Sequence, residues 1–406
     1  MWKNIRIWIG NRYQRIINSI AFYPALIAIF FLILSFLFTA FDFSEAGKNF
    51  KSHLHWLSLK DATTARSIIS SIVSGIISLA VFSFSMVMII LNQTASQMSN
   101  RILDKLIGNR FQQIILGIYI GTIVFALYLL STIRDVDSGI YIPALSTYFL
   151  IFLTIADIFL FIYFLHFITQ SVKYEVIIQR IYRDTCASMK AACMLKHGLK
   201  KEIAMPGSKI INANRSGVYE GFNRRELVEI CTDNECAIHI LQPPGKFVLM
   251  DTPILEASKE LNESVVNDLM NVLYLHDDET IENNFFYGFR QLTEVAVKAL
   301  SPGINDPATA IECLRALSKL FLFRMSNSPD TAIKNKQGQI WITTTQLSFE
   351  EIFSSCILPI WDYGKNDRMI QNELLAMLSY FHSVTEIFLV NKLLQEVKLA
   401  VEKNKY

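Results

Sequence analysis

The sequence predicts an α-helical membrane protein with four transmembrane helices, followed by a mixed α/β, mainly helical cytosolic domain that contains a small β-barrel-like subdomain. Hydrophobic residues make up 52% of the 406 residues, and 29 of them are phenylalanine. Charged residues are distributed unevenly, with 19 in residues 1–168 and 55 in the remaining 238. A soluble domain carries roughly 25% charged residues, so only the second part has the composition of a water-soluble domain.

Four segments are long and apolar enough to cross a bilayer, which requires about 20 mostly apolar residues. They lie near residues 16–41, 67–91, 111–133 and 141–167, and only the last contains a charged residue, Asp157. Because lipid offers no hydrogen-bond partner for free backbone groups, each segment is expected to be a helix. The first is too long for the apolar region of a signal peptide, so it is predicted to be a retained span.

The lysine and arginine residues beside the spans predict the orientation in the membrane. Residues 1–15, 101–110 and 173–201 carry 14 basic residues, and the loops expected on the other side carry five. Both termini are therefore expected to face the cytoplasm. The first outer loop, which holds four of those five residues, is the one feature that opposes this orientation.

The cytosolic part is predicted to contain three regions after the membrane domain of residues 1–168. Residues 169–203 are expected to form a connecting helix that continues from the fourth span. Residues 204–255 are expected to form the small β-rich subdomain, in which Asn223 and Glu226 have the spacing of a capping box. Residues 256–406 are expected to be mainly helical, beginning with an amphipathic helix up to Leu275.

The second span carries a stripe of small polar residues on one helix face. They recur at spacings of 3, 4 and 7: Ser67, Ser71, Ser74, Ser78, Ser85 and Asn92. Two interpretations stay open. Small hydroxyl residues let helices pack closely and form hydrogen bonds across the interface. The same residues are suited to lining a water-filled path in a homo-oligomer.

Asp157 lies near the middle of the fourth span, where a carboxylate is costly unless it faces protein or water. No basic residue lies at a similar depth in any span. The serine stripe of the second span, or an ordered water, is therefore its expected partner. The functional interpretation is an intramembrane ion or proton site, and the alternative is a structural carboxyl group that is hydrogen-bonded.

The sequence SPGINDP joins two helices expected at residues 285–300 and 307–325. Asp306 is suited to capping the second helix and Gly303 to a turn that a side chain would resist. A capped helical corner is one interpretation, and a contact with a small ligand is the other. The residues concerned are Arg290, Ser301, Gly303, Asn305 and Asp306. Arg290 lies in the first of these helices, about ten residues before the turn, and Glu294 at i+4 is its expected partner.

Metal and cofactor binding are not predicted. All six cysteines follow the fourth span, without a CxxC pair, and are expected to be reduced thiols in the cytosol. His53 and His55 are close in sequence but lack a third ligand. The net charge of +2 gives no reason to expect nucleic acid as a partner.

Three blocks of sequence resemble the bacterial membrane-protein family called domain of unknown function 2254. They are FSFSMVMIILNQTASQMSNRIL (82–103), SGVYEGFNRRELVEI with PGKFVLMDTPIL (216–255), and FYGFRQLTEVAVKALSPGINDPATA (286–310). The resemblance implies a multi-span protein of the bacterial inner membrane with a cytoplasmic domain, and no established activity. The family often has an acidic residue where this chain has Asn284, so no role for an acid is carried over to that position.

No hydrolase elbow, Walker loop, dinucleotide turn or HExxH motif occurs, so the chain is not expected to be an enzyme. The expected function is that of an oligomeric, channel-like or transport protein with a cytosolic gating or sensing domain. The alternative is a membrane-anchored sensor or scaffold whose cytosolic domain binds a protein or a small ligand.

Overall fold

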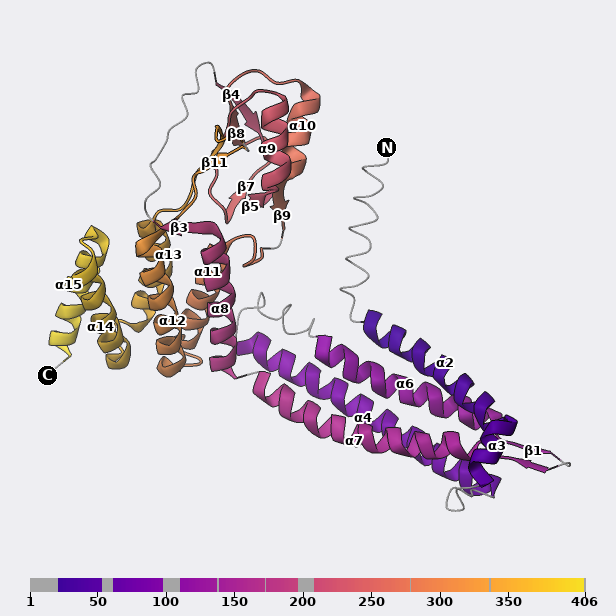
Figure 1. The fold of residues 1–406 in the computed structure, drawn as a ribbon. Helices are drawn as coiled ribbons and strands as arrows, with labels where there is room; N and C mark the ends of the chain where they lie inside the picture. Colours follow the sequence, from indigo (N-terminus) through magenta and orange to yellow (C-terminus); the bar gives the residue numbers. More distant parts are fainter. Residues whose placement is uncertain are drawn as a thin grey trace. The chain divides into compact units, whose positions relative to one another are not determined.

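The chain divides into two compact units in its computed structural model, unit 1 with residues 1–173 and unit 2 with residues 174–406. The described residues are 21–52, 61–97, 110–136, 139–171, 173–195, 208–277, 279–335 and 337–404. Unit 1 is built from long helices, and unit 2 combines open sheets with a group of helices (Figure 1).

Four helices of unit 1 are long and apolar enough to cross a membrane, as the sequence predicts. They are α2 (Phe22–Phe43), α4 (Ala62–Gln97), α6 (Arg110–Thr132) and α7 (Ala144–Ser171). Residues 16–20 of the predicted first span lie outside the described residues. The short helix α3 (Glu45–Ser52) follows α2, and strands β1 (Arg134–Val136) and β2 (Gly139–Tyr141) pair antiparallel between α6 and α7.

Helix α6 packs against α2, α4 and α7 and is the central helix of unit 1. Its contact with α2 depends on two glycines, because a Cβ atom at Gly117 or Gly121 would lie 2.7 Å from the side chain of Ile27 or Phe31. Buried positions recur every seven residues on the other two helices, as in left-handed helix bundles. They are Ile69, Ile76 and Ser83 on α4, and Leu150, Asp157 and Phe164 on α7. Ser83 and Asp157 therefore occupy core positions.

A carboxylate at the end of α2 caps the start of α7. Both the backbone N–H and the hydroxyl of Ser146 donate to Oδ2 of Asp42, at 2.9 and 3.0 Å, and Asp42 is fully buried. A negative charge at a helix N-terminus is favourable because the first N–H groups lack partners within the helix. Asp42 thus fixes the end of one span against the start of another, and the sequence analysis did not single it out.

The β-rich part of unit 2 contains a five-stranded and a three-stranded open sheet and, among the described residues, no closed barrel, so the expected barrel-like subdomain is not confirmed. The five-stranded sheet has the order β11 (Ala332–Lys334), β12 (Ile340–Thr344), β6 (Ile238–Ile240), β8 (Pro253–Ala257), β4 (Lys209–Asn212). The three-stranded sheet has the order β7 (Lys246–Val248), β5 (Gly217–Phe222), β9 (Leu273–His276). The strands of residues 209–257 are thus shared between the two sheets, and each sheet is completed by later strands.

Two helices cover the core of the β-rich part, α9 (Arg224–Asp233) and α10 (Glu263–Val272). Asn223 caps α9, since its side chain accepts a hydrogen bond from the N–H of Glu226 at 3.3 Å. The helix expected over residues 256–275 is wrong at both ends. Its start belongs to β8, which pairs with β4 and β6, and its end belongs to β9, which pairs with β5.

The helical part of unit 2 contains six helices among the described residues. They are α8 (Tyr174–Ala192), α11 (Phe285–Ala299), α12 (Pro307–Ser326), α13 (Phe349–Gly364), α14 (Arg368–Val384) and α15 (Phe388–Lys403). The connecting segment is not one helix continuing from the fourth span, because α7 ends at Ser171 and α8 ends where β3 (Cys193–Leu195) begins. Strand β3 pairs antiparallel with β10 (Asn327–Pro329). Phe321 lies at the centre of the helices, in ring contact with Phe289 and Phe353.

Gly288 allows α11 to lie directly against α8. A Cβ atom at this position would lie within 2 Å of Oγ1 of Thr185, and Thr185 is fixed by its own hydrogen bond to the carbonyl of Ile181 at 2.6 Å. The close packing of α11 against α8 therefore requires the glycine of the FYGFRQ sequence.

Gly288→Ala is expected to destabilise the protein by about 2 kcal/mol, because the new methyl group overpacks a tight contact. Chemical denaturation of the purified full chain measures this loss. Thr185→Ala removes the clashing oxygen, so the double variant should lose less stability than the sum of the two single variants. Gly303→Ala is the control, since a Cβ atom there meets no atom within 4 Å. Equal stabilities of the Gly288 and Gly303 variants would contradict this account.

Candidate functional site

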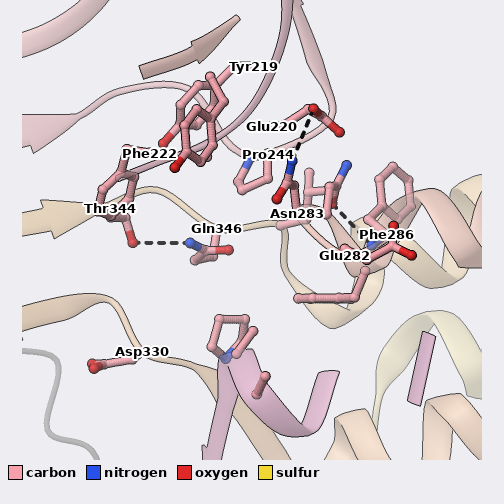
Figure 2. Close-up of a pocket in the computed structure, with 18 of the residues that line it drawn as sticks. Tyr219, Glu220, Phe222, Pro244, Glu282, Asn283, Phe286, Asp330, Thr344 and Gln346 are labelled. Atoms are coloured by element: carbon pink, nitrogen blue, oxygen red, sulfur yellow. Dashed lines mark hydrogen bonds between the residues drawn. The ribbon is translucent and has the colours of Figure 1, made fainter. Parts of the chain in front are cut away.

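A cavity of about 320 Å³ opens in unit 2 between the three-stranded sheet, the start of α11 and the segment after β12 (Figure 2). Its walls come from the end of α8, residues 219–222 of β5, residues 282–286, and Thr344, Gln346 and Leu347. In Figure 2, Glu220 and Asn283 face each other on one wall, and Gln346 donates to the hydroxyl of Thr344 at 3.1 Å on another. The volume is at the lower end of the range for small-molecule sites, roughly 300–1,000 Å³.

The cavity is lined by aromatic rings and by an excess of negative charge. The aromatic residues are Tyr219, Phe222, Tyr274, Phe285 and Phe286. The charged residues are Glu220, Glu282, Asp330 and Arg224. The guanidinium of Arg224 lies 3.8 Å from the carboxylate of Asp330, so the one cationic side chain among the described residues of the lining is paired.

Glu220 joins strand β5 to the segment that precedes α11. Its side chain is buried and accepts hydrogen bonds from the N–H of Thr280 at 2.5 Å, the hydroxyl of Thr280 at 3.2 Å and the amide of Asn283 at 3.4 Å. Several hydrogen bonds to one carboxylate offset the cost of removing its charge from water. Glu220 therefore fixes the wall of the cavity in place.

A second buried carboxylate, Glu279, lies behind the same wall. It forms an ion pair with Arg290 and accepts from the amide of Asn284 at 3.4 Å. The Asn284 side chain in turn accepts from the N–H of Phe286 at 3.1 Å and caps α11. The guanidinium lies 5.5 Å from the ring centre of Tyr287, within the range of a cation–π contact.

The sequence analysis expected Glu294 as the partner of Arg290 and did not identify Glu279. Glu279, Asn283 and Asn284 precede the helix, and Glu220 lies in a distant strand, so helical spacing gives no signal for them. One feature of the sequence could have pointed to these residues. Glu220 lies within one of the three sequence blocks that carry the family resemblance, and Asn284 lies two residues before another. The structure brings those two blocks together at the cavity.

A glycine is required at position 245, where the turn before β7 lies against the side chain of Asn284. Its φ angle is +87°, and its N–H donates to the carbonyl of Tyr219 at 2.7 Å. A Cβ atom would lie 2.7 Å from the amide nitrogen of Asn284. The turn can approach the cap of α11 because this residue has no side chain.

The SPGINDP corner lies at the end of α11 opposite to the cavity, about 22 Å away along a helix of 15 residues. The predicted cap is confirmed, because Asp306 accepts from the N–H and the hydroxyl of Thr309 at 3.2 and 2.6 Å. The expectation for Gly303 is wrong. The positive φ angle of the corner, +48°, belongs to Asn305, and Gly303 has open space where a Cβ atom would be. Ser301 accepts from the N–H groups of Ile304 and Asn305 through its carbonyl and closes the turn.

The serine stripe and Asp157 do not meet in the structure. All six stripe residues, Ser67, Ser71, Ser74, Ser78, Ser85 and Asn92, are exposed on α4. Asp157 is 1% exposed and lies next to Tyr119 and Thr122 of α6. The stripe is therefore the wrong partner for Asp157, because the sequence does not fix how each helix is rotated in the bundle. Ser67 and Ser71 instead border a shallow groove with Thr154 of α7.

The described residues include no group of three histidine, cysteine or acidic side chains placed to hold a metal ion. His53 and His55 lie outside the described residues. The six cysteines are free, and all except Cys186 are buried. Burial raises the pKa of Cys231 to about 12 and that of Cys356 to about 11, so neither thiol is activated as a nucleophile.

Gly245→Ala should destabilise the protein more than Gly338→Ala, by about 1–3 kcal/mol. Both glycines have a φ angle near +85°, so both variants carry the same backbone cost, but only the first adds a clash with Asn284. Chemical denaturation of the two purified variants measures the difference. If both lose the same stability, the close approach at Asn284 does not constrain the cavity wall.

The comparisons with known proteins agree with the membrane character of unit 1. A family model described as "Predicted membrane protein (DUF2254)" matches residues 17–380. The uncharacterized proteins Mb1321c of Mycobacterium bovis and Rv1290c of Mycobacterium tuberculosis are 22% identical to the chain over 309 residues, which cover 73% of this chain and 59% of each relative. The chain thus spans about three fifths of the length of these relatives. No solved structure matches.

Proposed function

The chain belongs to the DUF2254 family of predicted membrane proteins. We propose a function in which the spans anchor the protein in the membrane and the cavity of unit 2 binds a ligand. The protein is a membrane-anchored sensor whose unit 2 binds a small organic cation. The observation that carries this proposal is the lining of the cavity, whose described residues include three carboxylates, five aromatic rings and one guanidinium, which is paired with a carboxylate.

The chemistry of the lining favours a cation over an anion. Arg224 and Asp330 form an ion pair without net charge, so Glu220 and Glu282 make the described lining negative. A cation close to an aromatic face gains about 0.5–2 kcal/mol. A ligand with an ammonium group and a short apolar body would use both features.

The proposal is one of binding without catalysis. Glu220, the most buried acid of the lining, is engaged by Thr280 and Asn283 and holds the wall of the cavity. Its hydrogen bonds support a positioning role, and we assign no residue of the cavity to a reaction.

We place the protein in a bacterial inner membrane, with unit 2 in the cytoplasm. Support comes from the basic residues beside the spans. Among the described residues, Arg110 begins α6, and Lys173, Arg180, Arg183 and Lys190 follow α7 on the same side. The basic residues of segments 1–15 and 101–109 lie outside the described residues.

Spermidine and choline are the probes for the cavity, with acetate as the anionic comparison. Isothermal titration of the full chain in lipid nanodiscs should show binding of at least one cation and none of acetate. Ala191→Trp, which fills the cavity from the end of α8, should weaken that binding at least tenfold. Ala187→Trp places the same side chain on an exposed position of α8 outside the cavity and should leave binding unchanged.

Tighter binding of acetate than of either cation would reject the charge argument. Equal binding by the two tryptophan variants would place the ligand outside the cavity. Binding of neither cation at millimolar concentration would reject the organic-cation proposal.

A second candidate function rests on the stripe of α4. Six polar residues on the outer surface of a membrane helix are unfavourable against lipid, so a second copy of the chain, or water enclosed by several copies, is expected to cover them. In this candidate the homo-oligomer conducts a solute along the stripe, and unit 2 gates the path.

Replacing Ser71, Ser74 and Ser78 with leucine separates the two roles of the stripe. If the stripe lines a conduit, ion flux into liposomes is lost while the oligomer, measured by native mass spectrometry, stays intact. If the stripe is a packing surface, the oligomer itself dissociates. Val81→Leu, at an exposed apolar position of the same helix, should change neither quantity. Unchanged flux and unchanged assembly in the triple variant would reject both roles.

A further inference from the structure

Three membrane helices bring a group of polar side chains together in the middle of unit 1. Ser83 of α4, Tyr119 and Thr122 of α6, and Asp157 of α7 are each at most 1% exposed. The Thr122 hydroxyl lies next to the Asp157 carboxylate, and the Tyr119 hydroxyl lies near both Asp157 and Ser83. Asp157 is the fourteenth of the 28 residues of α7, so the cluster lies near the centre of the span.

The five side-chain oxygens of this cluster form no hydrogen bond of normal geometry with any described residue; their polar contacts are with one another, Thr122 with Asp157 and Ser83 with Tyr119. Other hydroxyls of the same bundle do not share this property. They donate to a carbonyl three or four residues earlier in their own helix: Ser35, Thr39, Ser78, Thr147 and Thr154. Ser83 and Thr122 depart from this pattern, because neither hydroxyl donates to a carbonyl of its own helix. Buried polar oxygens without a well-formed hydrogen bond cost free energy.

The cluster also lacks a compensating positive charge. Among the described residues of the four spans, the lysine and arginine side chains are Arg66 and Arg110, near the start of α4 and at the start of α6, and His166 lies nine residues beyond Asp157 on α7. Arg66 donates to the carbonyl of Ile133 at the end of α6. A bare carboxylate at the centre of a membrane bundle is strongly unfavourable, and a bound ion of charge +1 would balance it.

We propose that Asp157, Tyr119, Thr122 and Ser83 form a binding site for a sodium ion. Carboxylate and hydroxyl oxygens are hard donors, which favour hard cations. The single carboxylate matches a monovalent ion, since the other acidic side chain of the described spans, Asp42, is engaged at the start of α7. The ion engages the five oxygens and links α4, α6 and α7. This site is independent of the ligand proposed for unit 2.

Thermal unfolding of the full chain in nanodiscs tests the site. Sodium chloride replaces potassium chloride at constant ionic strength, and the unfolding midpoint should rise saturably with sodium because the ion binds only the folded state. Asp157→Asn should abolish this response. Thr122→Val and Ser83→Ala each remove one oxygen with little change of shape and should raise the half-saturating sodium concentration at least threefold.

Thr154→Val is the matched control, because the Thr154 hydroxyl already donates to the carbonyl of Leu150 at 2.8 Å. Its sodium response should equal that of the unaltered chain. An equal midpoint in sodium and potassium would overturn the proposal, and so would a full sodium response in the Asp157 variant. A midpoint that responds to pH but not to sodium would also overturn it, and would show that the carboxyl group binds a proton instead. If the Asp157 variant does not fold, the Thr122 and Ser83 variants decide the outcome.

Discussion

The absence of water from the hydrocarbon interior is the constraint on which unit 1 depends, because each buried polar group must find its partner within the protein. Most of them do so locally, by donating to carbonyls of their own helix. Asp42 does so across the bundle, by capping the first turn of α7 through Ser146. Asp157 is the other buried carboxylate of the described spans, and it lies where α4, α6 and α7 meet, beside hydroxyl groups but without a hydrogen bond of normal geometry. That contrast is the reason for assigning an ion to this position.

Buried carboxylates in unit 2 also need hydrogen-bond partners within the protein. Glu220 and Glu279 are buried carboxylates, and both are satisfied by the segment 279–290. That segment therefore joins the three-stranded sheet to α11, and the cavity lies where the two meet. Gly245 permits the close approach of the turn before β7. A polar network of this kind stabilises one arrangement of the wall because each of its members would lose a partner in any other.

The sequence predicted what local rules determine. Span length and apolar composition gave the four membrane helices, and capping chemistry gave the starts of α9 and α12 at Asn223 and Asp306. Strand pairing was not predictable, because β6 pairs parallel with β12 from a distant part of the chain. The neighbours of Asp157 and the Glu279–Arg290 pair were missed for the same reason, since each depends on how elements pack. Gly303 was mistaken for the strained residue of its corner, a role that Asn305 fills.

A high-resolution map of the full chain in lipid nanodiscs, determined once in sodium and once in potassium, tests the role of Asp157 most directly. In sodium, the account predicts density for an ion between the Asp157 carboxylate and the oxygens of Thr122, Tyr119 and Ser83. In potassium, that density should be absent or displaced. A carboxyl group hydrogen-bonded to one of these hydroxyls, with no ion density in either salt, would contradict the account.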